Sequence, residues 1–132
     1  MQTKGKILNA QLAGVIVGLG HRDRIVVTDA GLPLPGAVPV LDLSVVENRP
    51  RLVEVLGPVL NEMKVDTAYC ADRFADASPG VYAQVVKLLD GIELRPIPQA
   101  DLEEMMATAK LVVRTGEFSH FANLVLVAGV TF

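Results

Sequence analysis

Residues 24–31 read Arg24-Ile25-Val26-Val27-Thr28-Asp29-Ala30-Gly31, an apolar run followed by a polar turn. Consecutive β-branched apolar residues predict a short buried strand from Ile25 to Val27. The Asp-Ala-Gly after it predicts a turn, and a Pro-rich loop extends from Gly31 to Gly36. A buried strand that ends on a polar turn is the usual start of an α/β unit.

An amphipathic helix is predicted immediately before this strand. Asn9 can cap it, and Gly20 stands where a glycine commonly ends a helix. Its apolar positions recur at helical spacing: Leu8, Leu12, Val15, Ile16 and Leu19. His21 then falls in the connection between this helix and the strand.

The same alternation continues to the end of the chain. Further strands are predicted at 38–43, 67–71, 92–97, 111–113 and 123–131, with Pro39 favouring an edge position for the first of them. Helices are predicted from Pro50 (apolar positions Leu52, Val55, Leu56, Val59 and Met63), from Ser78-Pro79 (Val81, Val85, Val86 and Leu89), and over 100–109 (Leu102, Met105 and Met106). This order predicts an α/β fold: residues 1–132 form a single layered domain, with a largely parallel, Rossmann-like sheet flanked by helices.

Composition narrows the class of protein. Hydrophobic residues make up 51% of the 132 residues, which favours a homo-oligomer that buries the excess apolar surface. The net charge is −3 and the basic residues are scattered, which argues against nucleic acid as a partner. No apolar run approaches the length of a membrane helix, and no signal peptide is evident. The lone Cys70 fits a reducing cytoplasm, where we expect a buried structural thiol.

Ligands of such folds bind beyond the carboxyl ends of the strands. This rule selects Asp29 after the first strand, Thr115-Gly116-Glu117 after the fifth, and the segment 119–123 before the last. We expect the three segments to converge on one pocket.

His21 is the leading candidate for chemistry, because an imidazole gives and takes protons near neutral pH. With Asp29, one short strand away, it is a plausible acid/base pair; the alternative is a histidine that merely caps a helix end. Asp29 is also common turn chemistry, and Asn123 could bind sugar hydroxyls or satisfy loop backbone. Glu117 could be a second acid/base group, a site organiser or a surface charge, with surface charge the default. His120 is either a supporting residue of the site or, more simply, a loop histidine, and no zinc-ligand spacing is present.

Several blocks resemble the D-ribose pyranase family. They are Lys6–Leu12, Leu19–Asp23, Asp29–Pro35, Val113–Glu117, Ala122-Asn123 and Val127–Phe132. The related L-fucose mutarotases share the Gly-His, the Asp and the Thr-Gly-Glu but lack the Ala-Gly-Leu-Pro loop, so the chain is closer to the ribose side.

The resemblance implies an isomerase, a mutarotase that interconverts pyranose and furanose forms and anomers of D-ribose without a metal or organic cofactor. It implies ring-based assemblies, typically decamers, with sites between subunits. His21 matches the family's catalytic histidine, while Asp29 and Asn123 match sugar-binding positions. The backbone around Ala122 would help to hold the sugar, and Gln99 and Phe121 would line the pocket.

Two positions depart from the family pattern. Phe121 stands where the family usually has Tyr, and Gln99 where it usually has His. Phe121 lacks a hydroxyl, and Gln99 can form hydrogen bonds but cannot carry a proton at neutral pH. The alternatives left open are therefore a mutarotase for another monosaccharide, such as L-fucose, and a sugar-binding relative without turnover.

Overall fold

The computed structural model describes residues 6–130. Its elements, in chain order, are α1 (Ala10–Val17), β1 (Arg24–Thr28), β2 (Val40–Asp42), α2 (Leu52–Glu62), β3 (Val65–Ala71), α3 (Phe74–Ala77), α4 (Pro79–Leu89), β4 (Glu93–Ile97), α5 (Gln99–Met106), β5 (Leu111–Arg114) and β6 (Leu124–Ala128). The predicted extension of the last strand to Thr131 lies outside the described residues.

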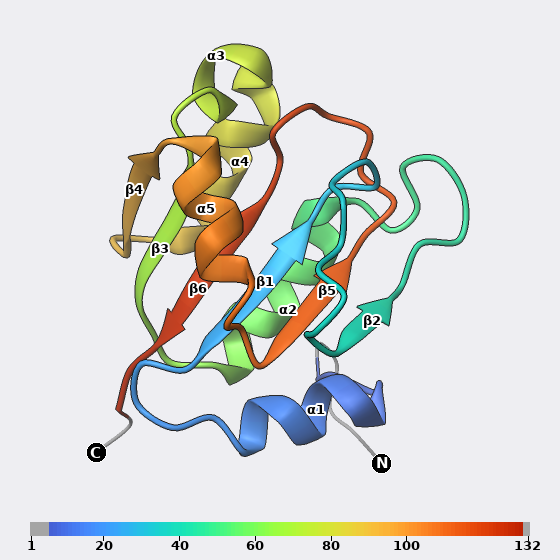
Figure 1. The fold of residues 1–132 in the computed structure, drawn as a ribbon, viewed down its shortest axis with the longest axis vertical. Helices are drawn as coiled ribbons and strands as arrows, with labels where there is room; N and C mark the ends of the chain where they lie inside the picture. The colour runs from blue at the N-terminus through green and yellow to red at the C-terminus, as the bar shows by residue number, and fades with distance from the viewer. Residues whose placement is uncertain (1–5, 131–132) are drawn as a thin grey trace.

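The strands form one mixed sheet in the order β2-β5-β1-β6-β3-β4 (Figure 1). β1, β2 and β5 pair in parallel, as do β3 and β4. β6 is antiparallel to its neighbours β1 and β3, so the other five strands all run in one direction. The predicted α/β fold with a largely parallel sheet is confirmed, and β2, which follows Pro39, lies at the edge as expected.

Helices cover both faces of the sheet, as the alternation of side chains along each strand requires. Ile25 and Val27 point to the face that packs against α1, α2 and α4, while Val26 points to the face covered by α5 (Figure 1). Most of the strand residues of β1, β5 and β6 are buried. No helix among residues 6–130 is both long and apolar enough to span a membrane.

Helix α1 is shorter than the spacing of its apolar residues predicts. The Asn9 side chain accepts a hydrogen bond from the Leu12 N–H at 2.9 Å and begins the helix, which leaves Leu8 outside it and 78% exposed. The C-cap is Gly18, so the expectation that Gly20 ends the helix is wrong. His21 therefore lies in a separate turn rather than at the end of the helix.

Two smaller expectations also fail. The short helix α3 was not predicted, because four residues that begin with Phe74 carry too little periodicity to be recognised. Val86 was placed in the apolar stripe of α4 but is 44% exposed, whereas Val85 and Leu89 are buried. The buried apolar face of α4 is therefore narrower than the predicted one.

Candidate functional site

The carboxyl ends of β1 and β5 bring polar side chains together, as predicted. They border a hollow of about 320 Å³, within the size range of small-molecule sites. Its lining is Asp29, Ala30, Gly31, Arg114, Glu117, Phe118, Ser119 and His120. We call this the Asp29 hollow. The expected convergence of the segments after β1, after β5 and before β6 is confirmed.

Asp29 is held in place by the turn that it starts. Its Oδ1 accepts hydrogen bonds from the N–H groups of Gly31 (3.1 Å) and Leu32 (2.9 Å), so the turn interpretation is confirmed. Burial raises the pKa of Asp29 above its usual 3.8, although the N–H groups of Gly31, Leu32 and Ala122 and the Asn123 side chain oppose the shift. A carboxylate that is both fixed and partly desolvated is suited to bind a hydroxyl group.

Asn123 supports Asp29 from the start of β6. Its Oδ1 accepts a hydrogen bond from the Asp29 N–H at 2.8 Å, and its Nδ2 lies 3.4 Å from Asp29 Oδ2. The side chain is buried and satisfies a backbone N–H, the second of the two alternatives for Asn123. Asn123 thus fixes the position of the neighbouring carboxylate.

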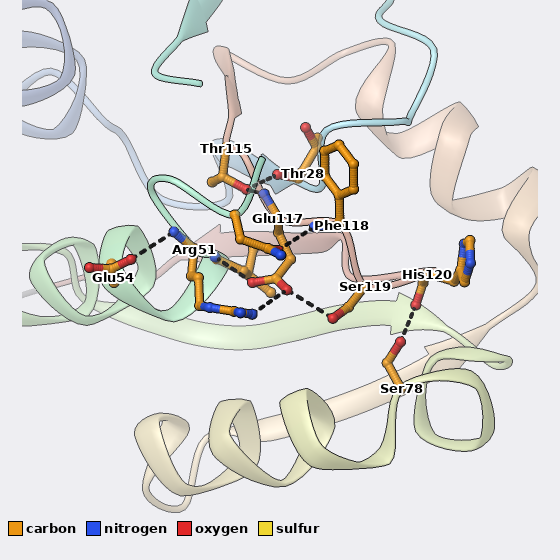
Figure 2. A network of polar contacts seen from close by, with 11 residues as sticks. Thr28, Arg51, Glu54, Ser78, Thr115, Glu117, Phe118, Ser119 and His120 are labelled. Atoms are coloured by element: carbon orange, nitrogen blue, oxygen red, sulfur yellow. Dashed lines mark hydrogen bonds and ion pairs between the residues drawn. The ribbon is translucent and has the colours of Figure 1, made fainter. Parts of the chain in front are cut away.

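Glu117 is a buried organiser of the hollow, and the default expectation of a surface charge is wrong. It is 1% exposed; its Oε1 accepts a hydrogen bond from the Leu52 N–H (2.9 Å), and Ser119 Oγ donates to its Oε2 at 2.8 Å (Figure 2). Arg51 Nη1 lies 3.3 Å from the same Oε2. Leu52 is the first residue of α2, and helix N-termini favour negative charge. Because Leu52 is 65 positions away, the sequence alone offered the organiser role only as one of three alternatives.

Residues 114–116 make hydrogen bonds and close contacts with the chain segments around the Asp29 hollow. Thr115 Oγ1 donates to the Thr28 carbonyl at 2.7 Å (Figure 2), and Arg114 Nη2 donates to the Ala30 carbonyl at 2.8 Å. Gly116 allows the loop at Arg49 to approach, because a Cβ at position 116 would lie 2.6 Å from the Arg49 carbonyl oxygen. Sequence reasoning missed Arg114 and Arg51. Arg114 ends β5 and its Nη1 lies 2.9 Å from Oδ2 of Asp42, its partner on β2, whereas Arg51 is positioned by the loop that leads into α2.

The remaining candidates lie around this edge in different environments. His120 is exposed and lines the Asp29 hollow, and Ala122 is fully buried beside Asn123. Phe121 has a positive φ of 59° and packs beneath the Arg73 guanidinium, 5.1 Å from the ring centroid. Gln99 is the first residue of α5, and its buried Oε1 has no hydrogen-bond partner among residues 6–130. Neither Phe121 nor Gln99 is among the residues that line the Asp29 hollow of a single chain.

His21 lies at the opposite edge of the sheet, before the start of β1. It borders a second hollow of about 380 Å³, the His21 hollow, lined by His21, Arg22, Arg24, Asp66, Thr67, Tyr69, Met105 and Val127. The strand between His21 and Asp29 spans roughly 15 Å at about 3.3 Å per residue. The expectation that His21 and Asp29 pair within one chain is therefore wrong, because the residues before and after a strand lie at its opposite ends.

Together, the fold and the hollows define an α/β domain with a partly acid-lined hollow of small-molecule size at the carboxyl edge of its sheet and a separate hollow beside His21 at the amino edge. Among the described residues, no group of three or more His, Cys, Asp or Glu side chains is placed to hold a metal ion. The chain belongs to the RbsD / FucU transport protein family, whose model matches residues 2–131. The resemblance in the sequence blocks is thereby confirmed.

Individual relatives match over nearly the whole chain. It is 36% identical to the D-ribose pyranase of Limosilactobacillus fermentum over 129 residues, which cover 98% of both chains. It is also 36% identical to the D-ribose pyranase of Escherichia coli O9:H4 over 137 aligned positions, which cover 98% of this chain and 99% of the relative. These relatives, both named D-ribose pyranase, confirm the prediction that the chain is an isomerase of this family.

Solved structures agree with these relationships. Bacillus subtilis RbsD in complex with D-ribose matches with a TM-score of 0.94 and 33% identity over 100% of both chains. The fucose mutarotase of Streptococcus pneumoniae, in complex with L-fucose, matches with a TM-score of 0.76 and 23% identity over 98% of this chain and 96% of the other. The latter likeness concerns the fold alone.

Proposed function

We propose that this protein is a mutarotase that interconverts the pyranose and furanose forms and the anomers of D-ribose, with His21 as general acid/base. The observation that carries the proposal is the match of the whole chain to ribose-bound Bacillus subtilis RbsD at 33% identity. Full-length relatives named D-ribose pyranase support the same substrate.

The chemistry requires proton transfer and no other reagent. A base removes the proton of the anomeric hydroxyl, the bond between the anomeric carbon and the ring oxygen breaks, and an acid protonates that oxygen. The open-chain aldehyde then closes through a different hydroxyl, which releases its proton to the base while the acid protonates the aldehyde oxygen to give the new anomeric hydroxyl. One imidazole can serve both roles, because it exchanges protons near neutral pH.

We propose that the working site is formed between two copies of the chain. A sugar that contacts Asp29 of one copy is too far from His21 of the same copy, but it can meet His21 of a neighbour. Exposed apolar side chains at both edges support such contacts: Leu8, before α1, is 78% exposed, Val17, the last residue of α1, is 87% exposed, and Phe118, which lines the Asp29 hollow, is 56% exposed. The ring-shaped decamer and the cytoplasmic location remain predictions.

Asp29 is proposed to accept a hydrogen bond from a sugar hydroxyl, held in place by Asn123 and the backbone near Ala122. Glu117 fixes the rim through Ser119 and the start of α2. Gln99 is proposed to contact the sugar only in the assembled protein: its buried Oε1 has no partner in the described chain, but it lies outside the Asp29 hollow of a single chain.

The test is NMR exchange spectroscopy on D-ribose at equilibrium. The unsubstituted protein should give exchange between pyranose and furanose anomeric signals, and His21→Ala should lose most of it. His120→Ala is the matched comparison, because the chain has only two histidines. Loss of exchange in His120→Ala but not in His21→Ala would transfer the acid/base role to His120.

Phe121 and Gln99 favour a second candidate, a mutarotase for another monosaccharide such as L-fucose. Phe121 supplies no hydroxyl, and its ring is occupied by the Arg73 guanidinium. A panel of aldoses at equal enzyme concentration would decide between the two, since the physiological sugar should show the largest exchange rate. Saturable ribose binding without faster exchange would instead indicate a sugar-binding relative without turnover.

A further inference from the structure

Asp66 is the carboxylate that His21 meets within its own chain. His21 Nε2 lies 3.5 Å from Asp66 Oδ2, and both residues line the His21 hollow. Asp66 is the second residue of β3, whereas His21 lies in the turn before β1, so the fold brings together two groups 45 positions apart. The proposed acid/base and this carboxylate are therefore neighbours by topology.

An irregularity in the sheet sets the direction of the Asp66 side chain. The register between β3 and β6 shifts between Val65 and Thr67: Val65 pairs with Ala128 and Thr67 with Val127. Asp66 is thus the extra residue of a bulge, a feature that redirects a side chain and is common beside active sites. A regular ladder would give Asp66 the ordinary alternating direction of a strand residue.

Gly129, directly after β6, leaves room for the Asp66 carboxylate. A Cβ at position 129 would lie 2.7 Å from Asp66 Cγ and closer still to Oδ1, inside van der Waals contact. Any larger residue there would push the carboxylate off its position. The absence of a side chain at Gly129 is therefore needed for this placement of Asp66.

Backbone hydrogen bonds fix the His21 turn to the same strand. The Arg22 N–H donates to the Ala128 carbonyl at 2.8 Å, and the Ala128 N–H donates to the Asp23 carbonyl at 2.8 Å. The positions of both His21 and Asp66 are thus set by contacts with the end of β6.

We propose that Asp66 is a positioning residue for His21 in the reaction proposed above, on which this inference rests. Asp66 accepts a hydrogen bond from the Nε2–H of His21. Nδ1 is then the nitrogen that exchanges protons with the sugar. The side chains of the pair are 48% and 47% exposed in a single chain, where such a contact contributes little. A second copy that covers the His21 hollow would remove water and strengthen it.

The first test separates rate from binding. Asp66→Ala should lower the exchange rate at saturating ribose about tenfold, a part of the roughly 10²–10⁴-fold that a positioned acid/base supplies, with the half-saturating ribose concentration unchanged. Asp66→Glu should restore most of the rate, and Gly129→Ala should resemble Asp66→Ala because it displaces the carboxylate. Glu103→Ala, which removes a carboxylate from the exposed side of α5, should behave like the unsubstituted protein.

The second test is the ¹⁵N spectrum of the His21 ring, assigned by comparison with His120→Gln. The unsubstituted protein should show a protonated Nε2 and an unprotonated Nδ1, and Asp66→Ala should shift both resonances towards a mixture of tautomers. This readout works whether or not ribose is the substrate. Unchanged ring resonances in Asp66→Ala would overturn the inference, even if the rate fell, because the loss would then be structural. An unchanged rate in a protein that exchanges ribose would also overturn it.

Discussion

Mixing two variants that are each strongly impaired should restore activity if the site is shared between copies. His21→Ala removes the acid/base and leaves the Asp29 hollow intact. Asp29→Asn keeps the turn, because an amide oxygen can still accept the Gly31 and Leu32 N–H groups. It weakens a charged hydrogen bond to the sugar by about 1.5–3 kcal/mol, which is about a 10- to 100-fold loss.

The magnitude follows from the positions of the two residues. In a randomly mixed assembly with equal amounts of both variants, a site draws His21 from one copy and Asp29 from its neighbour. Each is intact with probability one half, so about one quarter of the sites are complete. When a fraction f of the chains carries one substitution, the restored activity should follow f(1−f), with its maximum at equal amounts.

The assay is the ribose exchange rate per chain after the two variants are unfolded together and refolded as a mixture. The control is the same mixture made from separately refolded variants without exchange of chains. A site contained in one chain predicts no recovery at any ratio, because every chain then lacks one of the two residues. Absence of recovery in demonstrably mixed assemblies would refute the shared site.

Three further predictions concern individual groups. Burial raises the pKa of Asp29 above 3.8, so the native chain holds this proton more tightly than the unfolded chain, and that stabilisation is lost as the pH rises through the native pKa. Asp29→Asn should therefore gain stability relative to the unsubstituted protein as the pH rises above 3.8, seen in urea unfolding curves, and a pH-independent difference would contradict this. Glu117→Gln should lower the free energy of unfolding by about 1–3 kcal/mol in the same assay, because its amide would face groups that donate to the carboxylate; an unchanged midpoint would show that these contacts are dispensable. Burial, with a further contribution from the charge of Asp72, raises the pKa of Cys70 to about 11, so this thiol should react with a disulfide reagent at pH 8 only after unfolding, and rapid reaction of the native protein would show that it is accessible.

The fold was predictable because each strand carries its own signal. Runs such as Ile25–Val27 and Leu111–Val113 are buried on both faces, and Pro39 correctly indicated an edge strand. Element ends were less predictable, since a cap decides them and periodicity does not. The Asn9 side chain begins α1 after Leu8, although Leu8 fits the apolar spacing.

The site was predictable only where one strand end determines it. The rule for parallel sheets located Asp29 and the Thr115–Glu117 segment correctly. The same rule places His21, which precedes β1, at the opposite edge of the sheet. The expected pairing of His21 with Asp29 was wrong because it relied on their nearness in sequence. The burial of Glu117 and the Asp66 contact depend on partners 65 and 45 positions away, and no local pattern encodes such distances.

The separation of the two hollows also constrains the assembly. If the amino edge of one copy meets the carboxyl edge of the next, different surfaces are joined, and such head-to-tail contacts produce either closed rings or open filaments. A closed ring should give a single mass by light scattering that does not change with protein concentration, whereas a filament should grow. The apolar residues exposed at both edges, Val17 and Phe118 among them, would be covered in either case. Replacing Phe118 with Asp should therefore release smaller species and reduce ribose exchange together, since the contact and the site are the same surface. Loss of assembly with full exchange activity would show instead that one chain completes the site.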